Sequence, residues 1–255
     1  MSEQVFDPAL LKAIIFDLDG TLYRQNSLRR AMLVRLLRAH ASRPLSGLRA
    51  FRILGAYRRA QERLREELTI SMDLAEAQIR LTCEQTKVDA GDIAECVTRW
   101  MEQEPLHLLA RHLQAGLADF LRACQARGLR LAVLSDYPAD AKLAALGLNG
   151  YFDVVLAAQS AEVGVFKPHP RGLLLAAERL GVNASQCVYV GDRAEVDGPA
   201  AAAAGMACFI LAPRHRSRSQ RSWMHVDGYR QLHELLFEDG QTQTPQAPQP
   251  SLNGG

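Results

Sequence analysis

The chain has 255 residues, 48% of them hydrophobic and 23% charged, and its formal net charge is +2. This composition excludes a chain that is disordered throughout, and the length fits one domain with a large insertion or two modest domains. The small net charge also excludes a protein that binds polyanions through its overall charge.

The cysteine pattern and the apolar runs indicate the cellular compartment of the protein. The cysteines are scattered, odd in number and without CxxC spacing, so we expect reduced core residues: Cys83, Cys96, Cys124, Cys187 and Cys208. The N-terminal segment lacks the charged and then apolar pattern of a signal peptide, and the small apolar run at 199–213 is too short to span a bilayer. We therefore expect a soluble cytoplasmic protein without membrane association.

The first predicted strand, at residues 13 to 17, leads into two acids. Residues 13 to 16 are apolar, as in a strand buried on both faces, and Gly20 allows a sharp turn directly after Asp17 and Asp19. The acids therefore lie at a strand's carboxyl end, where ligands bind in open α/β sheets, and they can supply a nucleophile, an acid or base, or metal ligands. Taken alone, the stretch fits a plain strand followed by an Asp-Gly turn as well as it fits a functional pair of acids.

Residues 26 to 104 have the apolar spacing of helices. Three to five helices are expected, with breaks near Pro44, Gly47 and Gly91. Charge divides this block into two halves, because residues 24 to 65 hold twelve arginines and one acid whereas residues 66 to 104 hold ten acids and three bases. We expect the two halves to form ion pairs with each other.

From residue 105 onward, helix and strand patterns alternate. We predict strands at 129–134, 152–156, 187–190 and 207–211, and helices at 117–126, 139–146, 171–180, 200–204 and 229–237. Strands separated by helices of about ten residues predict a parallel sheet covered on both faces. Residues 214 to 221 have the pattern of a basic loop, and the residues from 240 onward have the composition of a disordered segment.

Polar residues follow four of the predicted strands, at their carboxyl ends or in the loops beyond them: Asp17 with Asp19, Ser135, Lys167, and Asp192 with Asp197. Each has a simpler interpretation, since a serine can cap a helix, a loop lysine can be solvated and Gly-Asp can form a turn. Together they place acids, a hydroxyl and a cation at one rim of one sheet, which suits a phosphorylated substrate. A hard divalent metal, most naturally Mg²⁺, would offset repulsion between the acids.

These motifs resemble those of the haloacid dehalogenase-like hydrolase superfamily. The four motifs occur in order as Asp17-Leu18-Asp19-Gly20-Thr21, Ser135 after the strand, Lys167 before Pro168, and Gly191 to Asp197. The resemblance covers roughly residues 13 to 22 and 113 to 212. It implies a Rossmann-like three-layer core with a mainly parallel sheet at 1–23 and 106–238, an inserted α-helical cap domain at 24–105, and a disordered tail at 239–255.

The resemblance also implies a role for each motif residue. Asp17 would attack phosphorus and form an aspartyl-phosphate, and Asp19 would protonate the leaving oxygen and later deprotonate the hydrolytic water. Mg²⁺ would be held by the Asp17 carboxylate, the Asp19 backbone carbonyl and Asp192. Ser135 and Lys167 would bind the phosphoryl group. Asp197 would support the water shell of the metal or Lys167.

The acid at Asp19 favours one branch of the superfamily. The dehalogenases of this superfamily lack an acid two residues after the nucleophile, so we predict a phosphatase that acts on a small phosphorylated metabolite. A phosphonate hydrolase would need a cap lysine, for which only Lys87 is available, and a phosphosugar mutase would use the same core. A non-catalytic binding or regulatory protein is the alternative from another class. Phosphoglycolate, a sugar phosphate and a nucleoside monophosphate all remain open as substrates.

The arginine-rich half of the helical block has three interpretations. The first is a solvated face with pairs to the acidic half, worth about 0–1 kcal/mol for each exposed pair. The second is recognition of an anionic substrate by one or two of Arg24, Arg29 and Arg30, which are close in sequence to Asp17. The third, ranked last, is a surface for nucleic acid or an anionic membrane, with a second basic patch at Arg214, Arg216, Arg218 and Arg221. We expect no nucleic-acid partner.

Overall fold

The core of the protein is a parallel β-sheet. The computed structural model describes residues 7–71, 73–211 and 223–237. Within them a six-stranded sheet has the order β3-β2-β1-β4-β5-β6, and each neighbouring pair of strands is parallel. The strands are β1 (Ala13–Phe16), β2 (Arg130–Ser135), β3 (Val154–Ala157), β4 (Cys187–Gly191), β5 (Ala207–Leu211) and β6 (Met224–Val226).

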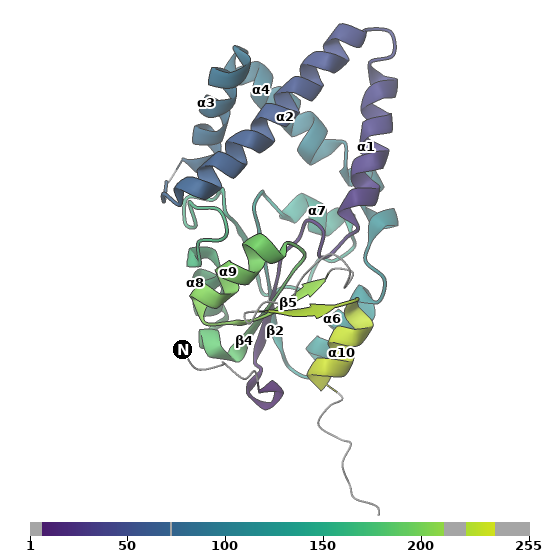
Figure 1. The fold of residues 1–255 in the computed structure, drawn as a ribbon. Helices are drawn as coiled ribbons and strands as arrows, with labels where there is room; N and C mark the ends of the chain where they lie inside the picture. The colour runs from purple at the N-terminus through teal and green to yellow at the C-terminus, as the bar shows by residue number, and fades with distance from the viewer. Residues whose placement is uncertain (1–6, 72, 212–222, 238–255) are drawn as a thin grey trace, which may run out of the picture.

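Helices cover both faces of this sheet and give three layers (Figure 1). One face is covered by α6 and α10 and the other by α8 and α9, and each interface has its own hydrophobic cluster. The core helices are α5 (Leu106–Leu109), α6 (Leu117–Ala126), α7 (Asp140–Ala145), α8 (Arg171–Leu180), α9 (Ala194–Ala204) and α10 (Tyr229–Phe237). The predicted α/β class with a Rossmann-like three-layer core is therefore confirmed.

The apolar run of β1 explains its central position. Ile14 and Phe16 pack into the cluster beneath α6 and α10, whereas Ala13 and Ile15 pack into the cluster beneath α8 and α9. Successive side chains of a strand point to opposite faces, so a strand between two helical layers must be apolar at every position. This packing fixes β1, and with it the start of the acidic segment that follows.

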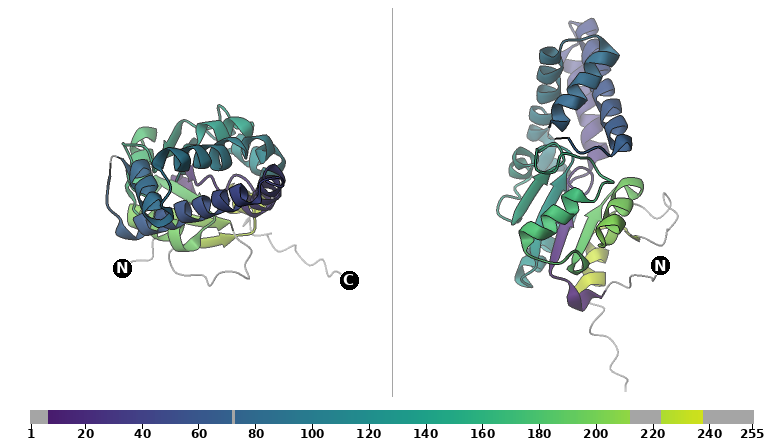
Figure 2. Two further views of the ribbon diagram at one scale, coloured as in Figure 1. Left: turned by 90° about the horizontal axis from the view of Figure 1, so that it is seen from above. Right: turned by 90° about the vertical axis from the view of Figure 1, so that its left-hand side faces the viewer.

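A second group of helices lies beyond the carboxyl ends of the strands (Figures 1 and 2). It consists of α1 (Gln25–Ala39), α2 (Pro44–Glu67), α3 (Leu74–Thr86), α4 (Ala90–Val97) and the π-helical turn η2 (Thr98–Gln103). Helices α2 and α4 share a small core made of Ile53, Tyr57, Ile93 and Val97. This group is the helical cap that the sequence predicts, while its boundaries at 24 and 105 stay predictions. No helix in the described part of the chain is long and apolar enough to cross a membrane.

Some predicted boundaries were wrong. Helix α9 begins at Ala194 rather than at residue 200, because Pro199 is accommodated inside the helix instead of ending it. The predicted breaks at Gly47 and Gly91 lie inside α2 and α4, near their first turns, where a glycine costs little. Strand β6 was not predicted, since three residues are too few for a periodic pattern. The basic residues at 214–221 and the tail at 239–255 lie outside the described residues.

Candidate active site

Most of the predicted site residues line one cavity of about 310 Å³ between the sheet and the cap. The core side of its wall includes five of them: Asp17, Asp19, Lys167, Asp192 and Asp197. Strand β1 ends one residue before Asp17, and β4 ends at Gly191. The Asp17 N–H donates to the Val190 carbonyl across these two strands at 2.8 Å. Parallel pairing thus brings together motifs that are far apart in the sequence.

Lys167 is the buried cation at the centre of the site. Its Nζ lies 2.5 Å from Asp17 Oδ1 and 2.8 Å from Asp197 Oδ1, and it donates to the Tyr189 hydroxyl at 2.8 Å. Burial alone would lower the pKa of Lys167, but the charges of Asp17 and Asp197 raise it well above its ordinary value. Lys167 therefore stays charged, and it lies against the acid that is the predicted nucleophile.

The carboxylates of the site differ in how well they are compensated. Burial raises the pKa of Asp17 well above its ordinary value; Lys167 opposes this effect, and the charges of Asp197 and Asp192 add to it. Burial, followed by the charge of Asp197, raises the pKa of Asp192 to about 7. Burial would also raise the pKa of Asp197, but Lys167 holds it below its ordinary value. The positive charge near Asp17 and Asp192 therefore does not offset their burial and the charges of the neighbouring acids.

Asp197 fixes the loop that follows β4. Its Oδ2 accepts hydrogen bonds from the N–H groups of Asp192 at 3.1 Å and Arg193 at 2.9 Å, while its Oδ1 contacts Lys167. A Cβ at Gly191 would lie 2.3 Å from Asp197 Oδ2, so this approach requires a glycine. Of the two supporting roles considered for Asp197, the observed contact is with Lys167.

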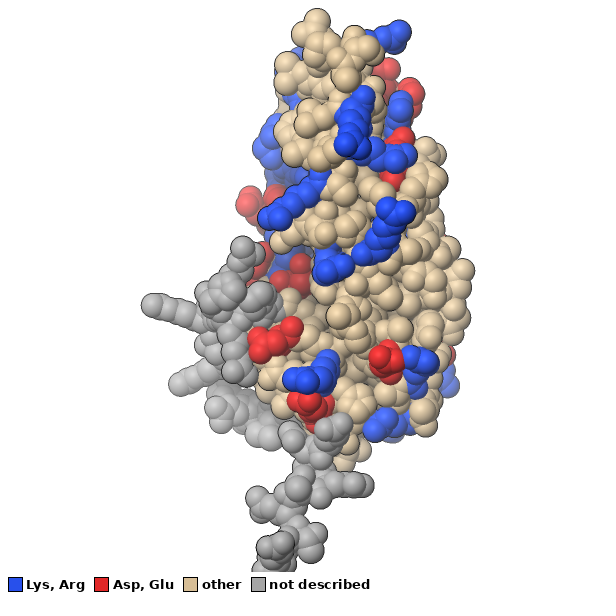
Figure 3. All heavy atoms as spheres, turned by 90° about the vertical axis from the view of Figure 1, so that its right-hand side faces the viewer, with Lys and Arg blue, Asp and Glu red and all other residues tan. Residues whose placement is uncertain are grey.

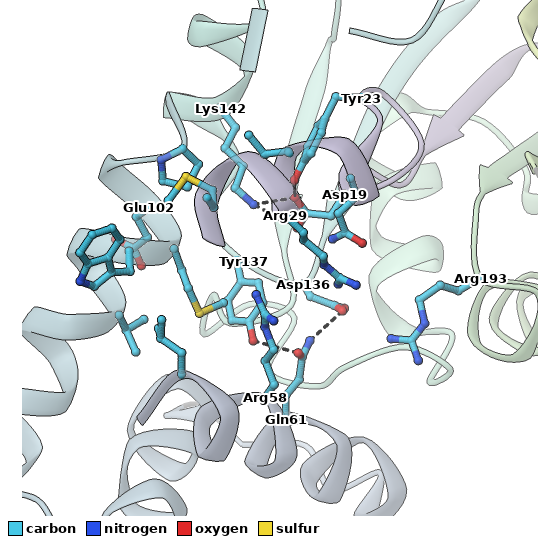
Figure 4. Close-up of a pocket in the computed structure, with 18 of the residues that line it drawn as sticks. Asp19, Tyr23, Arg29, Arg58, Gln61, Glu102, Asp136, Tyr137, Lys142 and Arg193 are labelled. Carbon is cyan, nitrogen blue, oxygen red and sulfur yellow. Dashed lines mark hydrogen bonds and ion pairs between the residues drawn. The ribbon is translucent and has the colours of Figure 1, made fainter. Parts of the chain in front are cut away.

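Asp19 has two partners that the sequence analysis missed. Lys142 donates to both carboxylate oxygens, at 2.7 and 3.0 Å, and the Tyr23 hydroxyl donates to Oδ1 (Figure 4). Burial would raise the pKa of Asp19, but the Lys142 charge and both sets of hydrogen bonds lower it. Tyr23 lies four residues after Asp19 in the sequence, and this proximity is a usable signal, whereas Lys142 belongs to α7 and gave none.

Ser135 ends β2, beside β1, but it is not among the residues that line the cavity. It is 1% exposed, and its Oγ accepts a hydrogen bond from the Tyr137 N–H at 3.3 Å. The structure thus places Ser135 at the predicted strand end and brings the next two residues, Asp136 and Tyr137, to the cavity wall.

Asp136 connects this strand end to the cap. Its Oδ2 accepts hydrogen bonds from Gln61 Nε2 and Arg65 Nη2, both at 2.8 Å, and both donors belong to α2. Arg65 also donates to the carbonyl of Lys167. One helix of the cap is therefore tied to two motif segments of the core. No sequence pattern marks these residues, since the contact depends on how the cap sits on the sheet.

The residues present fit a hydrated Mg²⁺ ion. Among the described residues, no three or more His, Cys, Asp or Glu side chains are grouped to hold a metal. The predicted ligands are only two carboxylates and one carbonyl, and Mg²⁺ commonly keeps several waters beside one or two carboxylates. A Cβ at Gly20, whose φ is +109°, would lie 2.0 Å from Asp192 Oδ2, so Asp192 packs against the backbone of the first motif. A cation there would stabilise the ionised forms of Asp17 and Asp192.

Two arginines of the cap face the acids across the cavity. Arg29 of α1 and Arg58 of α2 line the wall and extend into it (Figure 4). Neither forms an ion pair with a residue that the structure describes. Partial desolvation, followed by the charge of Arg29, lowers the pKa of Arg58. Of the three arginines considered for substrate recognition, only Arg29 lines the cavity.

The remaining charges of the cap are dispersed. Three arginines of the basic half pair with the acidic half, Arg35 with Glu104, Arg49 with Asp92 and Arg63 with Glu67, and all six side chains are partly exposed. In Figure 3 the blue side chains of the cap lie scattered among other atoms. Lys87, the only cap lysine, is exposed at the end of α3 and is not part of the cavity wall.

Comparison with known proteins agrees with this arrangement. The family model of the haloacid dehalogenase-like hydrolases matches residues 11–205. The chain is 30% identical over 205 residues to a glyceraldehyde 3-phosphate phosphatase of Methanopyrus kandleri, covering 77% of this chain and 82% of the relative. It is 31% identical over 204 residues to a phosphoglycolate phosphatase of Shigella dysenteriae, covering 76% and 79%.

Solved structures show the same fold. A 2-haloacid dehalogenase from Pseudomonas syringae superposes with a TM-score of 0.62 at 23% identity, covering 89% of this chain and 98% of the other. A phosphatase from Thermococcus onnurineus superposes with a TM-score of 0.56 at 24% identity, with the same coverage. From the match of the family model and the identity to these relatives, the chain belongs to the haloacid dehalogenase-like hydrolase family of enzymes.

Proposed function

We propose that this enzyme is a Mg²⁺-dependent phosphatase that hydrolyses a small phosphomonoester through an aspartyl-phosphate on Asp17. The observation that carries the proposal is the arrangement of Asp17, Asp19 and Lys167 around one cavity. A buried carboxylate held 2.5 Å from a lysine suits a nucleophile for phosphorus, and a second acid two residues on suits proton transfer. The phosphatases among the relatives add support.

The proposed reaction has two steps. An oxygen of Asp17 attacks phosphorus, the bond from phosphorus to the ester oxygen breaks, and Asp19 gives its proton to that leaving oxygen. Water then attacks the phosphorus of the aspartyl-phosphate and transfers a proton to Asp19, which releases phosphate and restores the Asp17 carboxylate. Both steps use the same pair of acids, so the proton balance of the cycle closes.

The other side chains of the site supply charge and orientation. Lys167 places positive charge beside Asp17, where it reduces repulsion between the carboxylate and an anionic phosphoryl group. Asp17, Asp192 and the Asp19 carbonyl would hold Mg²⁺, which supplies further charge neutralisation when bound. We propose that Ser135 exchanges its hydrogen bond with the Tyr137 N–H for one with the phosphoryl group and so becomes a phosphate ligand. Arg29 and Arg58 attract the phosphoester from the cap side.

Turnover of p-nitrophenyl phosphate tests the proposal. We expect release of p-nitrophenol that requires Mg²⁺ and falls by about a thousandfold or more in Asp17→Asn, because the neutral amide cannot attack phosphorus. Asp119→Asn removes an exposed carboxylate from α6 and serves as the matched control. Turnover that is independent of Mg²⁺, or that survives Asp17→Asn, would contradict the mechanism.

A further inference from the structure

The catalytic cavity continues into the cap as a groove. The residues that line the cavity together with Asp17 and Lys167 include segments of α1, α2 and η2. On α2 this lining extends from Glu62 to Phe51, a helical stretch of about 16 Å. The cavity is therefore much longer than a phosphoryl group, and its extension lies on the cap side, away from the core acids.

The groove changes from polar to apolar with distance from the acids. Near the phosphoryl site its wall contains Arg58, Gln61 and Tyr137. Farther along α2 the lining residues are Leu54 and Phe51. Leu54 lies three residues from Phe51 and four from Arg58, and this spacing places all three on one face of the helix. A leaving group that fills this space contacts hydrogen-bonding groups near the phosphoryl site and apolar side chains at the far end of the groove.

The opposite walls of the groove are mainly apolar, with Glu102 of η2 as a charged residue among them (Figure 4). On α1 they include Met32, Leu33 and Leu36, and on η2 they include Trp100 and Met101. Leu36 and Trp100 are buried in the small cluster that joins α1 to the rest of the cap. The far end of the groove is thus built on packed side chains, which give it a defined floor.

Part of this apolar wall is exposed. Leu33 is 44% exposed and Phe51 is 58% exposed, and both line the groove. Exposed apolar surface that is continuous with a catalytic cavity is the feature expected of a ligand-binding groove. Because the groove opens directly onto Asp17, the group that covers these side chains is one attached to the phosphate.

We propose that the natural substrate is a phosphomonoester whose alcohol carries an elongated apolar portion, and that this portion lies in the groove formed by α1, α2 and η2. The inference rests on the proposed phosphatase function for the chemical step. Hydrolysis breaks the bond between phosphorus and the ester oxygen and releases the apolar alcohol with the proton from Asp19. The occupant is thus a part of the substrate and not a second protein.

Gly55 offers a way to obstruct the groove. It lies inside α2 between Leu54 and Arg58 and lines the cavity, and an added Cβ meets only the flexible end of Arg59, at 3.4 Å. Leucine favours a helix more than glycine does, so Gly55→Leu fills the groove without breaking α2. Gly91→Leu makes the same change in α4, away from the cavity, where an added Cβ meets nothing within 4 Å.

The experiment measures the dissociation constants of n-alkyl phosphonates, which cannot be hydrolysed, from methyl to octyl by calorimetry with Mg²⁺. A buried methylene contributes about a threefold to fourfold gain in affinity, so we expect octyl phosphonate to bind at least about a hundredfold more tightly than methyl phosphonate. We expect this ratio to fall towards one in Gly55→Leu and to stay unchanged in Gly91→Leu. Leu33→Asp, which changes an exposed residue, serves as a second groove variant.

The outcomes separate the inference from the proposed function. A ratio near one in the wild-type protein, or a ratio that neither groove variant lowers, overturns the groove as the binding site for an apolar chain. Release of inorganic phosphate from methyl and octyl phosphate is measured in parallel. If chain length governs binding but no Mg²⁺-dependent hydrolysis occurs, the phosphatase proposal fails while the groove assignment stands.

Discussion

Lys142 donates hydrogen bonds to both oxygens of the Asp19 carboxylate, at 2.7 and 3.0 Å, although the two residues are 123 positions apart in the chain. Both side chains are largely buried, with exposed fractions of 10% and 19%. A buried ion pair of this kind fixes the orientation of a carboxylate and favours its ionised form. In the free enzyme Asp19 is therefore held as a carboxylate, and in the proposed mechanism it must gain a proton before it acts as an acid.

Lys142→Met is expected to lower kcat for an alkyl phosphate by roughly ten- to a hundredfold, because an unrestrained Asp19 loses its alignment with the leaving oxygen. The loss should be smaller for p-nitrophenyl phosphate, since nitrophenolate leaves without a proton. Steady-state kinetics on both substrates check this. Lys87→Met changes an exposed cap lysine and is the control. Equal losses on both substrates would contradict a role in the protonation of the leaving oxygen by Asp19.

Arg58→Ala is expected to lower kcat/KM by roughly tenfold, since a guanidinium that faces the cavity without an ion pair is available to a substrate anion. The loss should be largest at low ionic strength, because salt screens the attraction of a partly exposed charge. Arg52→Ala alters an exposed arginine of the same helix that does not line the cavity. An equal effect of both substitutions would show that the net charge of the cap matters rather than Arg58 itself.

Arg65→Ala is expected to reduce the free energy of unfolding by about 3 kcal/mol, because it removes the cation beside the mostly buried Asp136 carboxylate and leaves only the hydrogen bond from Gln61 among the described residues. Urea denaturation monitored by circular dichroism measures this. Arg63→Ala, two residues earlier in α2, breaks only an exposed pair with Glu67 and should change the stability by about 0.5 kcal/mol or less. A similar small effect at Arg65 would show that the cap and core are not held by this contact.

The buried cysteines are expected to resist modification. Burial raises the pKa of Cys124 from 9.0 to about 12, so at pH 8 it has about a thousandfold less thiolate than an ordinary cysteine. Burial also raises the pKa of Cys187 to about 11 and that of Cys208 well above its ordinary value. With Ellman's reagent at pH 8, Cys83 and Cys96 should react first, since they are only half-buried. Peptide mapping identifies the sites, and early labelling of Cys124 would refute the assignment.

The structure shows which of the basic residues near the site in sequence, or in the cap, reach the cavity. Lys87 lies outside the cavity wall, so the lysine that a phosphonate hydrolase would need is not placed there by the cap. Arg29 faces the cavity, whereas the Arg24 guanidinium donates to the Arg111 carbonyl at 3.2 Å. Proximity in sequence to Asp17 was therefore a poor guide to which arginine reaches the site, because the direction of a side chain depends on its position around the helix.

The sequence by itself determined the sheet, the helical insertion and the set of acids, lysine and serine at the strand ends. These features are local: a run of apolar residues specifies a buried strand, and the ends of parallel strands share one edge. Only the tertiary structure decided what surrounds them. The partner of Asp19 comes from α7, the partners of Asp136 come from α2, and the groove lies between α1, α2 and η2. Such contacts depend on the packing of whole helices against one another and on the sheet, which periodicity and motif spacing do not encode.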